Sequence, residues 1–467
     1  MTADWGPWRT QAQQIRVRVA IGEPLGEALA ILLLCSLLLA VPLWNGFPLI
    51  FYDTGAYLAQ GIGGEYLPER AAVYSLFLRY FGAYTSLWRI ASIQSLITAF
   101  VMVEFLRMES PRLSLFRALF IAALICAATG ICWYVGQIEP DCFAAVTLLA
   151  LYLLAFRSNE LGRPRCVLLF LIAGFAAAAH PSHLGLSAGL VLTTGLVALA
   201  KRKWTWLPKA NVQLTLGSTA LALCLVLAAN YSYTQQIYVS RTGTVFLFAR
   251  MMQDGIIKRL LDDTCPDAGY KICPYRDRLK TRADAWLWDR DSPFIVLNGF
   301  KGTDTESGIL VRESLKRYPW MNVRAALMET GRQFVKFSTG DQIEPQQWAL
   351  YTVLKAYIPS QLEEYMAARQ QHQRFNFAAM NWLHVTVGAL SLVALVVTLI
   401  LAWGRREGVQ TILPAFVLIG LLGNAFICGA LANPHDRYQS RLIWLPSFVL
   451  LVTTGSFSLR RRAESGT

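Results

Sequence analysis

Residues 26–44, GEALAILLLCSLLLAVPLW, decide the fold class. A helix needs about 20 consecutive apolar residues to cross the hydrocarbon core of a bilayer, and this stretch is long enough for one crossing. It is too long for the apolar core of a cleaved signal peptide, and no small-residue cleavage site follows it. We therefore expect it to be the first membrane span.

The rest of the chain repeats this pattern. Of its 467 residues, 55% are hydrophobic and 16% are charged, and the apolar residues form long runs instead of alternating with polar ones. We therefore expect an all-α polytopic membrane protein with about ten spans. The expected spans are residues 26–45, 87–106, 113–134, 142–156, 165–179, 184–200, 211–232, 378–403, 410–431 and 442–458.

Basic residues indicate the orientation of these spans. The formal net charge is +13, but Lys and Arg form short clusters in alternate loops, which is typical of cytoplasmic loops and not of nucleic-acid binding. We expect both termini to be cytoplasmic, in a multi-pass protein of a bacterial inner (cytoplasmic) membrane, with the active side periplasmic or extracellular. The clusters are Arg9, Arg16 and Arg18; Arg107 and Arg112; Arg157, Arg163 and Arg165; Lys201, Arg202, Lys203 and Lys209; Arg405 and Arg406; and Arg460, Arg461 and Arg462.

The spans divide the chain into three parts. Residues 1–232 are an N-terminal membrane domain with about seven spans, and residues 378–467 are a C-terminal membrane domain with the remaining spans. Between them, residues 233–377 are an extracytoplasmic domain that is mainly helical and has neither a Gly-rich phosphate loop nor a nucleophile elbow. This insertion either covers a site, recognises an acceptor, or serves only as a structural cap.

Two of the nine cysteines differ from the others in their surroundings. Seven lie in or beside apolar runs, where cysteine packs as a small hydrophobic residue. Cys265 and Cys273 lie in the polar insertion, without the neighbouring Cys or His residues that a zinc site needs. They are candidates for a local disulfide, which would place the insertion in an oxidising compartment.

The first outer loop, residues 46–86, contains the sequence FPLIFYDTGAYL. Its Asp53 lies among apolar and aromatic residues, and partial desolvation suits a carboxylate that takes a proton from a hydroxyl. The alternative is a turn or helix-capping residue, since Asp-Thr-Gly favours turns. Residues 71–85 follow with Arg79 among Tyr and Phe, and we expect an interfacial helix there.

The second outer loop, GQIEPDCF, has Glu139 and Asp141 on either side of Pro140. The proline holds both carboxylates near the start of a helix. There they could bind a divalent cation, Mg²⁺ or Mn²⁺, beside a phosphate. The alternative is that they cap the exposed N–H groups of the helix.

A third polar segment, AAAAHPSHLGL, interrupts an apolar run between the fifth and sixth expected spans. Pro181 breaks the helix and leaves His180 and His183 at the membrane edge. Histidine there can donate a hydrogen bond to a phosphate or bind a metal. A plain interfacial turn explains the same pattern.

The last outer loop, ANPHDRYQSRLIWLP, carries His435, Asp436, Arg437, Tyr438 and Arg441 before the final span. Arg437 and Arg441 are four residues apart and share one face of a helix. Arginine matches phosphate oxygens bidentately and stays charged, and it is uncommon on the outer side. We therefore favour phosphate binding over a structural ion pair with Asp436.

In these features the chain resembles the membrane glycosyltransferases of the C-type fold. That group includes protein O-mannosyltransferases, the bacterial aminoarabinose transferase and the catalytic subunit of oligosaccharyltransferase. The resemblance extends over the whole chain: an acidic first outer loop (Asp53) followed by interfacial helices, an acidic second loop (Glu139, Asp141), a large outer domain after the seventh span, and late outer arginines (Arg437, Arg441). No acidic neighbour adjoins Asp53, so no subfamily is assigned.

The resemblance implies transfer of a sugar from a polyprenyl-phosphate-linked donor to an outer glycan, lipid or protein, with inversion. Asp53 would be the catalytic base or would orient the acceptor, and Arg437, Arg441 and His435 would hold the donor phosphate. The residues expected to line the site are Glu139, Asp141, His180, His183, Tyr57, Arg79 and Tyr438.

Two other classes of function remain as alternatives. A secondary transporter or lipid flippase would need charged groups near the middle of the spans or repeat symmetry between two halves, and the sequence offers only Arg89 and Glu104. A non-catalytic membrane assembly protein would use the insertion for docking and would have no outer chamber joining Asp53 to Arg437.

Overall fold

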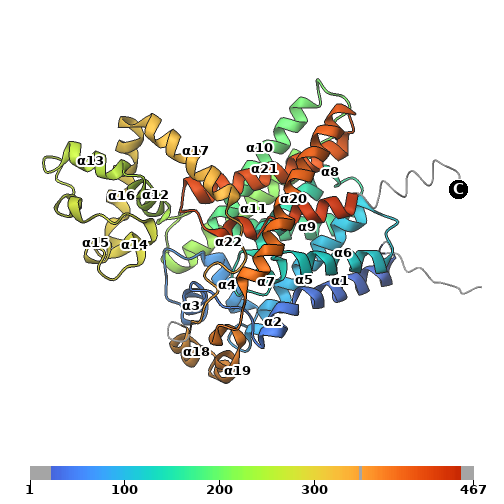
Figure 1. Ribbon diagram of the computed structural model, residues 1–467, viewed down its shortest axis with the longest axis horizontal. Coiled ribbons are helices and arrows are strands. Elements are labelled where there is room, and N and C mark those ends of the chain that lie inside the picture. The colour runs from blue at the N-terminus through green and yellow to red at the C-terminus, as the bar shows by residue number, and fades with distance from the viewer. Residues whose placement is uncertain (1–20, 22, 347–349, 454–467) are drawn as a thin grey trace, which may run out of the picture.

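The structure is a computed structural model that describes residue 21 and residues 23–346 and 350–453 (Figure 1). These residues form helices joined by loops, and the only strand-like pairing among them is one isolated bridge between two outer loops. The basic clusters of both tails, residues 9–18 and 460–462, lie outside the described residues. The helices of the membrane part are α1 (Pro24–Leu38), α2 (Ala40–Asn45), α5 (Leu87–Glu109), α6 (Leu115–Ala128), α7 (Ile131–Val135), α8 (Cys142–Phe156), α9 (Arg163–Ala178), α10 (Pro181–Ala200), α11 (Val212–Thr234), α20 (Phe377–Gly404) and α21 (Gly408–Ala430).

By length and composition, six helical segments of the described chain could cross a membrane, as expected for a multi-pass helical membrane protein. The total of about ten stays a prediction, because α6, α8 and α9 are shorter and the last expected span is described only to residue 453. The six are Pro24–Asn45, Leu87–Glu109, Pro181–Ala200, Val212–Thr234, Phe377–Gly404 and Gly408–Ala430.

One expected span is interrupted in the structure. Residues 113–134 form two helices, α6 and α7, which are separated at Thr129 and Gly130. A Cβ atom at Gly130 would lie 2.6 Å from the hydroxyl oxygen of Thr339, so a late segment of the insertion approaches the backbone closely at this break. The long-range contact that accompanies the break is not visible in the local sequence.

The short helix α8 is the centre of the membrane part. Its sequence, CFAAVTLLALYLLAF, is apolar on all sides, and nearly every residue is buried. A helix that is hydrophobic all round must be surrounded by other helices, and α8 packs against α5, α9, α10 and α11. Because α8 is interior, the polar loop at its N-terminal end is held inside the protein and not at its edge.

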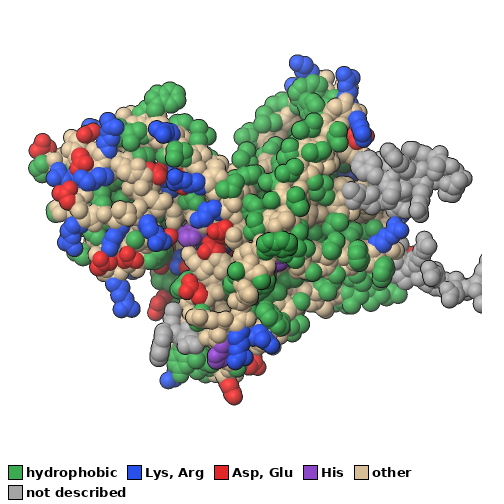
Figure 2. Space-filling view, in the orientation of Figure 1, with side chains coloured by type: hydrophobic (Ala, Val, Ile, Leu, Met, Phe, Trp, Pro, Cys, Tyr) green, Lys and Arg blue, Asp and Glu red, His purple; other side chains and the backbone are tan. Residues whose placement is uncertain are grey.

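Ion pairs join helix ends on the side opposite the outer loops. Arg165 at the start of α9 pairs with Glu27 of α1 at 2.5 Å and with Glu104 of α5, and Arg157 pairs with Glu109 at 2.8 Å. Glu104 therefore lies near the end of α5 and not at its middle. Figure 2 shows blue basic side chains at this end of the membrane helices.

The residues between α11 and α20 separate into two regions. Helices α12 (Gly243–Gln253) to α16 (Gly299–Arg317) form a lobe with its own hydrophobic core, seen at the left of Figure 1. Residues 336–346 and 350–376 instead pack against the membrane part and the first outer loop, so that Leu354 and Tyr365 belong to its core. The other helices here are α13 (Ile256–Thr264), α14 (Ala283–Trp288), α15 (Pro293–Val296), α17 (Pro319–Val335), α18 (Tyr351–Tyr357) and α19 (Leu362–Ala367).

Cys265 and Cys273, the candidate disulfide pair, are joined by a disulfide with a Cα–Cα distance of 5.6 Å. In the first outer loop, α3 (Thr54–Leu58) continues into a π-helix (Ala59–Gly63), and α4 (Ala72–Tyr80) follows. The expected interfacial helix 71–85 is thus shorter in the structure. One side of α4 is buried against the π-helix and α11, while Tyr80, Phe81 and Tyr84 are exposed.

Candidate active site

Backbone pairing between two outer loops positions Asp53. The N–H of Leu49 donates to the carbonyl of Gly136 at 2.9 Å, and the N–H of Ile138 donates to the carbonyl of Leu49 at 2.9 Å. The Thr54 hydroxyl then donates to the carbonyl of Ile138 at 3.0 Å. These bonds hold the loop that ends at Asp53 beside the EPD loop.

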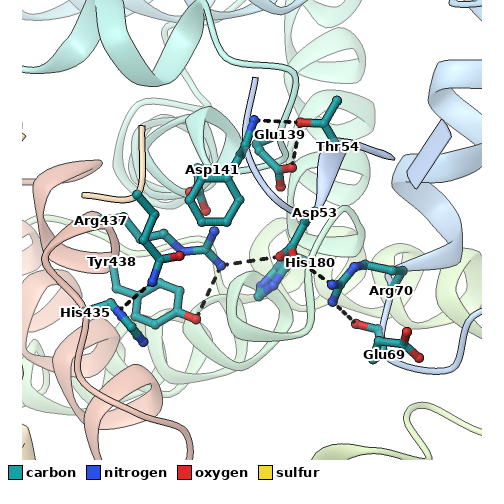
Figure 3. A network of polar contacts seen from close by, with 12 residues as sticks. Asp53, Thr54, Glu69, Arg70, Glu139, Asp141, His180, His435, Arg437 and Tyr438 are labelled. Carbon is teal, nitrogen blue, oxygen red and sulfur yellow. Dashed lines mark hydrogen bonds and ion pairs between the residues drawn. The ribbon is translucent and has the colours of Figure 1, made fainter. Parts of the chain in front are cut away.

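Asp53 lies between two guanidinium groups (Figure 3). Arg70 donates to its Oδ1 at 2.6 Å, and Arg437 approaches its Oδ2 at 3.7 Å. The exposed side-chain fractions are 21% for Asp53, 11% for Arg70 and 12% for Arg437, so the cluster is enclosed but still reaches solvent. Arg437 also lies over the ring of Phe51, 4.1 Å from its centroid.

Several donor atoms of this cluster have no partner. Among the described residues, Nε of Arg70 and Nη1 of Arg437 are buried and make no hydrogen bond. A buried donor without an acceptor is costly, and more so when it carries charge. Both atoms belong to the guanidinium groups beside Asp53, so the unused donors lie next to this carboxylate.

Glu139 lies beneath Asp53 and is almost completely buried. Thr54 bonds to it through a 3.2 Å contact with Oε1. Burial, together with the nearby charge of Asp53, raises the pKa of Glu139 well above the usual value for a glutamate. Its side chain therefore favours the neutral form more than an exposed glutamate does.

Arg441 does not lie beside Asp53, although the sequence pattern predicts a contact with the donor phosphate. Its side chain is 0% exposed and donates to Oδ1 of Asp141 at 2.6 Å. Burial opposes ionisation of Asp141, but the Arg441 guanidinium outweighs it and lowers the pKa of this carboxyl below its usual value. The turn of helix from Arg437 to Arg441 points the second arginine into the protein, where it joins the last span to α8.

The two histidines of the HPSH segment also have internal partners. Nδ1 of His180 accepts from the N–H of Ser182 at 3.2 Å and so caps the start of α10. His183 is fully buried, with Nδ1 hydrogen-bonded to the carbonyl of Ala176 at 3.1 Å. His180 lies in the neighbourhood of Asp53 in Figure 3.

His435 joins three parts of the chain instead of facing Asp53. Its Nε2 lies 3.4 Å from the carboxylate of Asp284 in the lobe, and its Nδ1 lies 3.6 Å from Asp341. Burial lowers the pKa of His435, but its contacts with the two carboxylates prevail and raise it to about 8. His435 is therefore occupied by carboxylates where the sequence predicted a phosphate.

Three further residues that the sequence predicted for the site are Tyr438, Tyr57 and Arg79. Tyr438 stacks beside Arg437, with 4.9 Å from the guanidinium to the ring centroid. Tyr57, a residue of α3, is buried against Tyr74, with 5.0 Å between the ring centroids. Arg79 is exposed at the end of α4, within electrostatic reach of Tyr233.

Sequence reasoning missed Arg70, which makes the shortest contact with Asp53. Arg70 lies in the same outer loop, in the segment LPERAAVY. The argument that singled out Arg437, that arginine is uncommon on the outer side, applies equally to Arg70 and could have identified it.

The carboxylates do not form a metal site. Within residues 23–346 and 350–453, no group of three or more His, Cys, Asp or Glu side chains is arranged to hold a cation. Asp53 and Asp141 each face an arginine, and Glu139 favours its neutral form. The residues present therefore do not fit the Mg²⁺ or Mn²⁺ that the EPD loop allowed.

Comparisons with known proteins do not assign this chain to a family. No protein-family model, curated protein or solved structure matches the chain. The resemblance to the C-type glycosyltransferases thus depends on the sequence features quoted above alone.

Proposed function

We propose that the protein is a membrane glycosyltransferase that moves a sugar from a polyprenyl-phosphate-linked donor to an acceptor at the outer face. One observation carries the proposal: a partly exposed carboxylate, Asp53, lies between two arginines, each with one buried nitrogen that has no partner among the described residues. Loops that are far apart in the sequence supply these three groups. The combination provides a proton acceptor and an anion-binding pair at a single point.

Arg70 and Arg437 are suited to hold the donor phosphate. A phosphate oxygen would accept from Nε of Arg70 and Nη1 of Arg437, buried donors beside Asp53 that lack partners among the described residues. Charge-assisted hydrogen bonds to phosphate are short and strong. This assignment keeps Arg437 from the sequence prediction and replaces Arg441, whose Nη1 and Nη2 groups donate to Asp141 and Ser182 inside the protein.

Charge also favours an anionic ligand at this point. Asp53 neutralises one of the two adjacent guanidinium groups, and Glu139 contributes little negative charge while it is protonated. The cluster therefore retains about one positive charge in an enclosed setting, where an electrostatic interaction is stronger than in water. A phosphodiester donor, which carries a single negative charge, would balance it.

The chemical step would be a single displacement. The acceptor hydroxyl attacks the anomeric carbon, a new carbon–oxygen bond forms, and the hydroxyl proton moves to the Asp53 carboxylate. The bond between the anomeric carbon and the phosphate oxygen breaks, and polyprenyl phosphate leaves with the electron pair. Arg70 and Arg437 stabilise the charge that develops on the leaving phosphate, and their shift toward it releases Asp53 to accept the proton.

The lobe borders the same site and is suited to recognise the acceptor. The guanidinium of Arg70 lies 5.8 Å from the ring centroid of Trp288 in α14. Trp288 is 49% exposed, and so is Tyr52, the residue before Asp53. Two exposed aromatic rings beside a carboxylate offer flat apolar surfaces on which a sugar or another acceptor can lie.

The test uses Asp53→Asn, which keeps the shape of the side chain and removes its basicity. Cells that lack the protein, or that express the wild type or the variant, are compared by mass spectrometry of their envelope glycans. Glu65→Gln is the matched control, because Glu65 is an exposed carboxylate of the same loop. We expect one glycan to require the wild type, to persist with Glu65→Gln and to disappear with Asp53→Asn at equal membrane levels.

Two results would contradict the proposal: full glycan production by Asp53→Asn, or identical glycans with and without the protein.

A second measurement tests whether the two arginines bind the donor phosphate. In nanodiscs, Arg70→Gln and Arg437→Gln should each weaken binding of polyprenyl phosphate by about 2 kcal/mol, or ~30-fold. Arg89→Gln, at an exposed arginine near the start of α5, should leave that affinity unchanged.

A further inference from the structure

Helix α17 has its polar side inside and its apolar side outside. Glu329 is 2% exposed and Gln333 is fully buried, although both are polar. Besides Arg324 and Arg332, the large exposed side chains of this helix are apolar. They are Trp320 (82%), Val323 (47%), Leu327 (68%), Met328 (45%) and Val335 (68%). In a helix that faced water on this side, the exposed side chains would be mainly polar and the buried ones mainly apolar.

The buried polar side has specific partners. Nε2 of Gln333 donates to the carbonyl of His435 at 2.8 Å, and Oε1 of Gln333 accepts from the N–H of His435 at 2.9 Å. A Cβ atom at Gly429 of α21 would lie 2.5 Å from the carbonyl oxygen of Glu329, so α17 and α21 approach very closely there. These contacts fix the rotation of α17, and the apolar side must face outward.

The exposed apolar residues form one stripe. Their positions 320, 323, 327, 328 and 335 recur at the spacing of successive turns of a helix, and Arg324 and Arg332 lie on the same exposed side. Scattered exposed apolar residues need no explanation, but a stripe of them along one side of a helix indicates an interaction surface.

The stripe belongs to a helix that packs against a candidate membrane span. Helix α17 packs along α21, a candidate membrane span whose outward residues Ile419, Leu422 and Phe426 are exposed. Figure 2 shows a notch at the top of the view between the lobe and the membrane helices, with green apolar side chains on both of its walls. The outer leaflet of the bilayer would fill this notch.

We propose that α17 is an interfacial helix whose apolar stripe lies in the outer leaflet of the bilayer. An amphipathic helix of this kind places its apolar side about 5–10 Å into the boundary between headgroups and acyl chains. Trp320 then lies where tryptophan is enriched in membrane proteins. Arg324 and Arg332 lie level with the lipid phosphates, and Lys316 and Arg317 at the end of α16 add positive charge toward anionic headgroups.

A second copy of the chain fits this surface less well. A two-fold interface through the stripe would bring the same surface of each copy together. Arg324 and Arg332 of one copy would then face those of the other, which is unfavourable for like charges. The bilayer instead offers acyl chains to the stripe and phosphates to the arginines. This inference is independent of the proposed sugar transfer.

The experiment places a photoreactive benzophenone amino acid at position 327 in the full chain, reconstituted in phospholipid nanodiscs. Position 422, on α21, is the positive control for contact with lipid. Position 296 in the lobe is the matched negative control, because Val296 is 67% exposed and Leu327 is 68% exposed. After irradiation, mass spectrometry identifies the adducts of each variant.

We expect lipid adducts at position 327 in a yield comparable to that at position 422, and none at position 296. Absence of lipid adducts at 327 while 422 is labelled would overturn the inference. Cross-linking of 327 to a second copy of the chain would also overturn it, in favour of an interface between copies. Each variant must first elute from gel filtration as the wild type does, so that a misfolded sample is recognised before irradiation.

Discussion

Substitution of Arg441 by Gln tests whether this arginine is structural or binds a ligand. The wild-type side chain is 0% exposed and donates to Asp141 at 2.6 Å, and to Ser182 and Asn424 at 3.0 Å each. The other carboxylate oxygen of Asp141 has no hydrogen-bond partner among the described residues, so Asp141 depends on Arg441 for its stabilisation.

Removal of the guanidinium leaves the Asp141 charge buried and uncompensated. Loss of one partner of a buried ion pair costs about 3–5 kcal/mol, which is a large part of a typical free energy of unfolding of about 5–15 kcal/mol. The double variant Asp141→Asn, Arg441→Gln should lose less than the sum of the two single losses, because neither charge then remains.

The free energy of unfolding can be measured in mixed micelles of a mild detergent and dodecyl sulfate, with tryptophan fluorescence as the signal. Arg405→Gln is the control, because Arg405 is exposed at the end of α20, and its cost should stay within about 0.5 kcal/mol. The structural role would be refuted if Arg441→Gln unfolded like the wild type and lost only its affinity for polyprenyl phosphate.

Three further predictions concern the lobe and its attachment to the membrane part. The pKa of His435 is about 8 in the folded protein and about 6.5 in the unfolded chain. The stabilisation that His435 gains from Asp284 should therefore be complete below pH 6.5 and lost as the pH rises through 8, which lowers the free energy of unfolding by about 2 kcal/mol. Unfolding measured at pH 6 and at pH 9 would show this difference. His435→Gln should remove this pH dependence. Cys265→Ser opens a loop with a sequence separation of 8 residues and should destabilise the lobe by about 2.5 kcal/mol, measurable by hydrogen exchange. Gly429→Val would place side-chain atoms against the backbone of α17 and should cost about 1–3 kcal/mol in unfolding measurements, whereas Gly404→Val, with open space around it, should have no such effect.

The general character of the protein was predictable from sequence because it depends on local composition. Long apolar runs such as residues 26–44 have few alternatives to a membrane helix, and basic clusters between them predict an orientation. The interruption at Gly130 was not predictable, because it accompanies contact with Thr339, far along the chain.

The candidate site was predictable only in outline. Position in the outer loops was enough to select Asp53 and Arg437, since both are unusual among their neighbours. The same reasoning assigned Arg441 to the ligand, but one turn of helix and the position of Asp141 direct its side chain into the protein. Arg70 was overlooked because its segment has no motif, and only its folded position brings it to Asp53.

The sequence by itself determined a helical chain with several membrane-crossing helices, because hydrophobic length and charge clustering act through the bilayer, which is present whatever the tertiary fold. The tertiary structure alone decided which charges meet. Two arginines four residues apart separate into a solvent-reaching group beside Asp53 and a buried partner of Asp141, and a helix of the insertion turns its apolar side outward. The physical reason is that charge pairing and burial depend on distances through space between segments that can be hundreds of residues apart, as the separation of 300 residues between Asp141 and Arg441 shows.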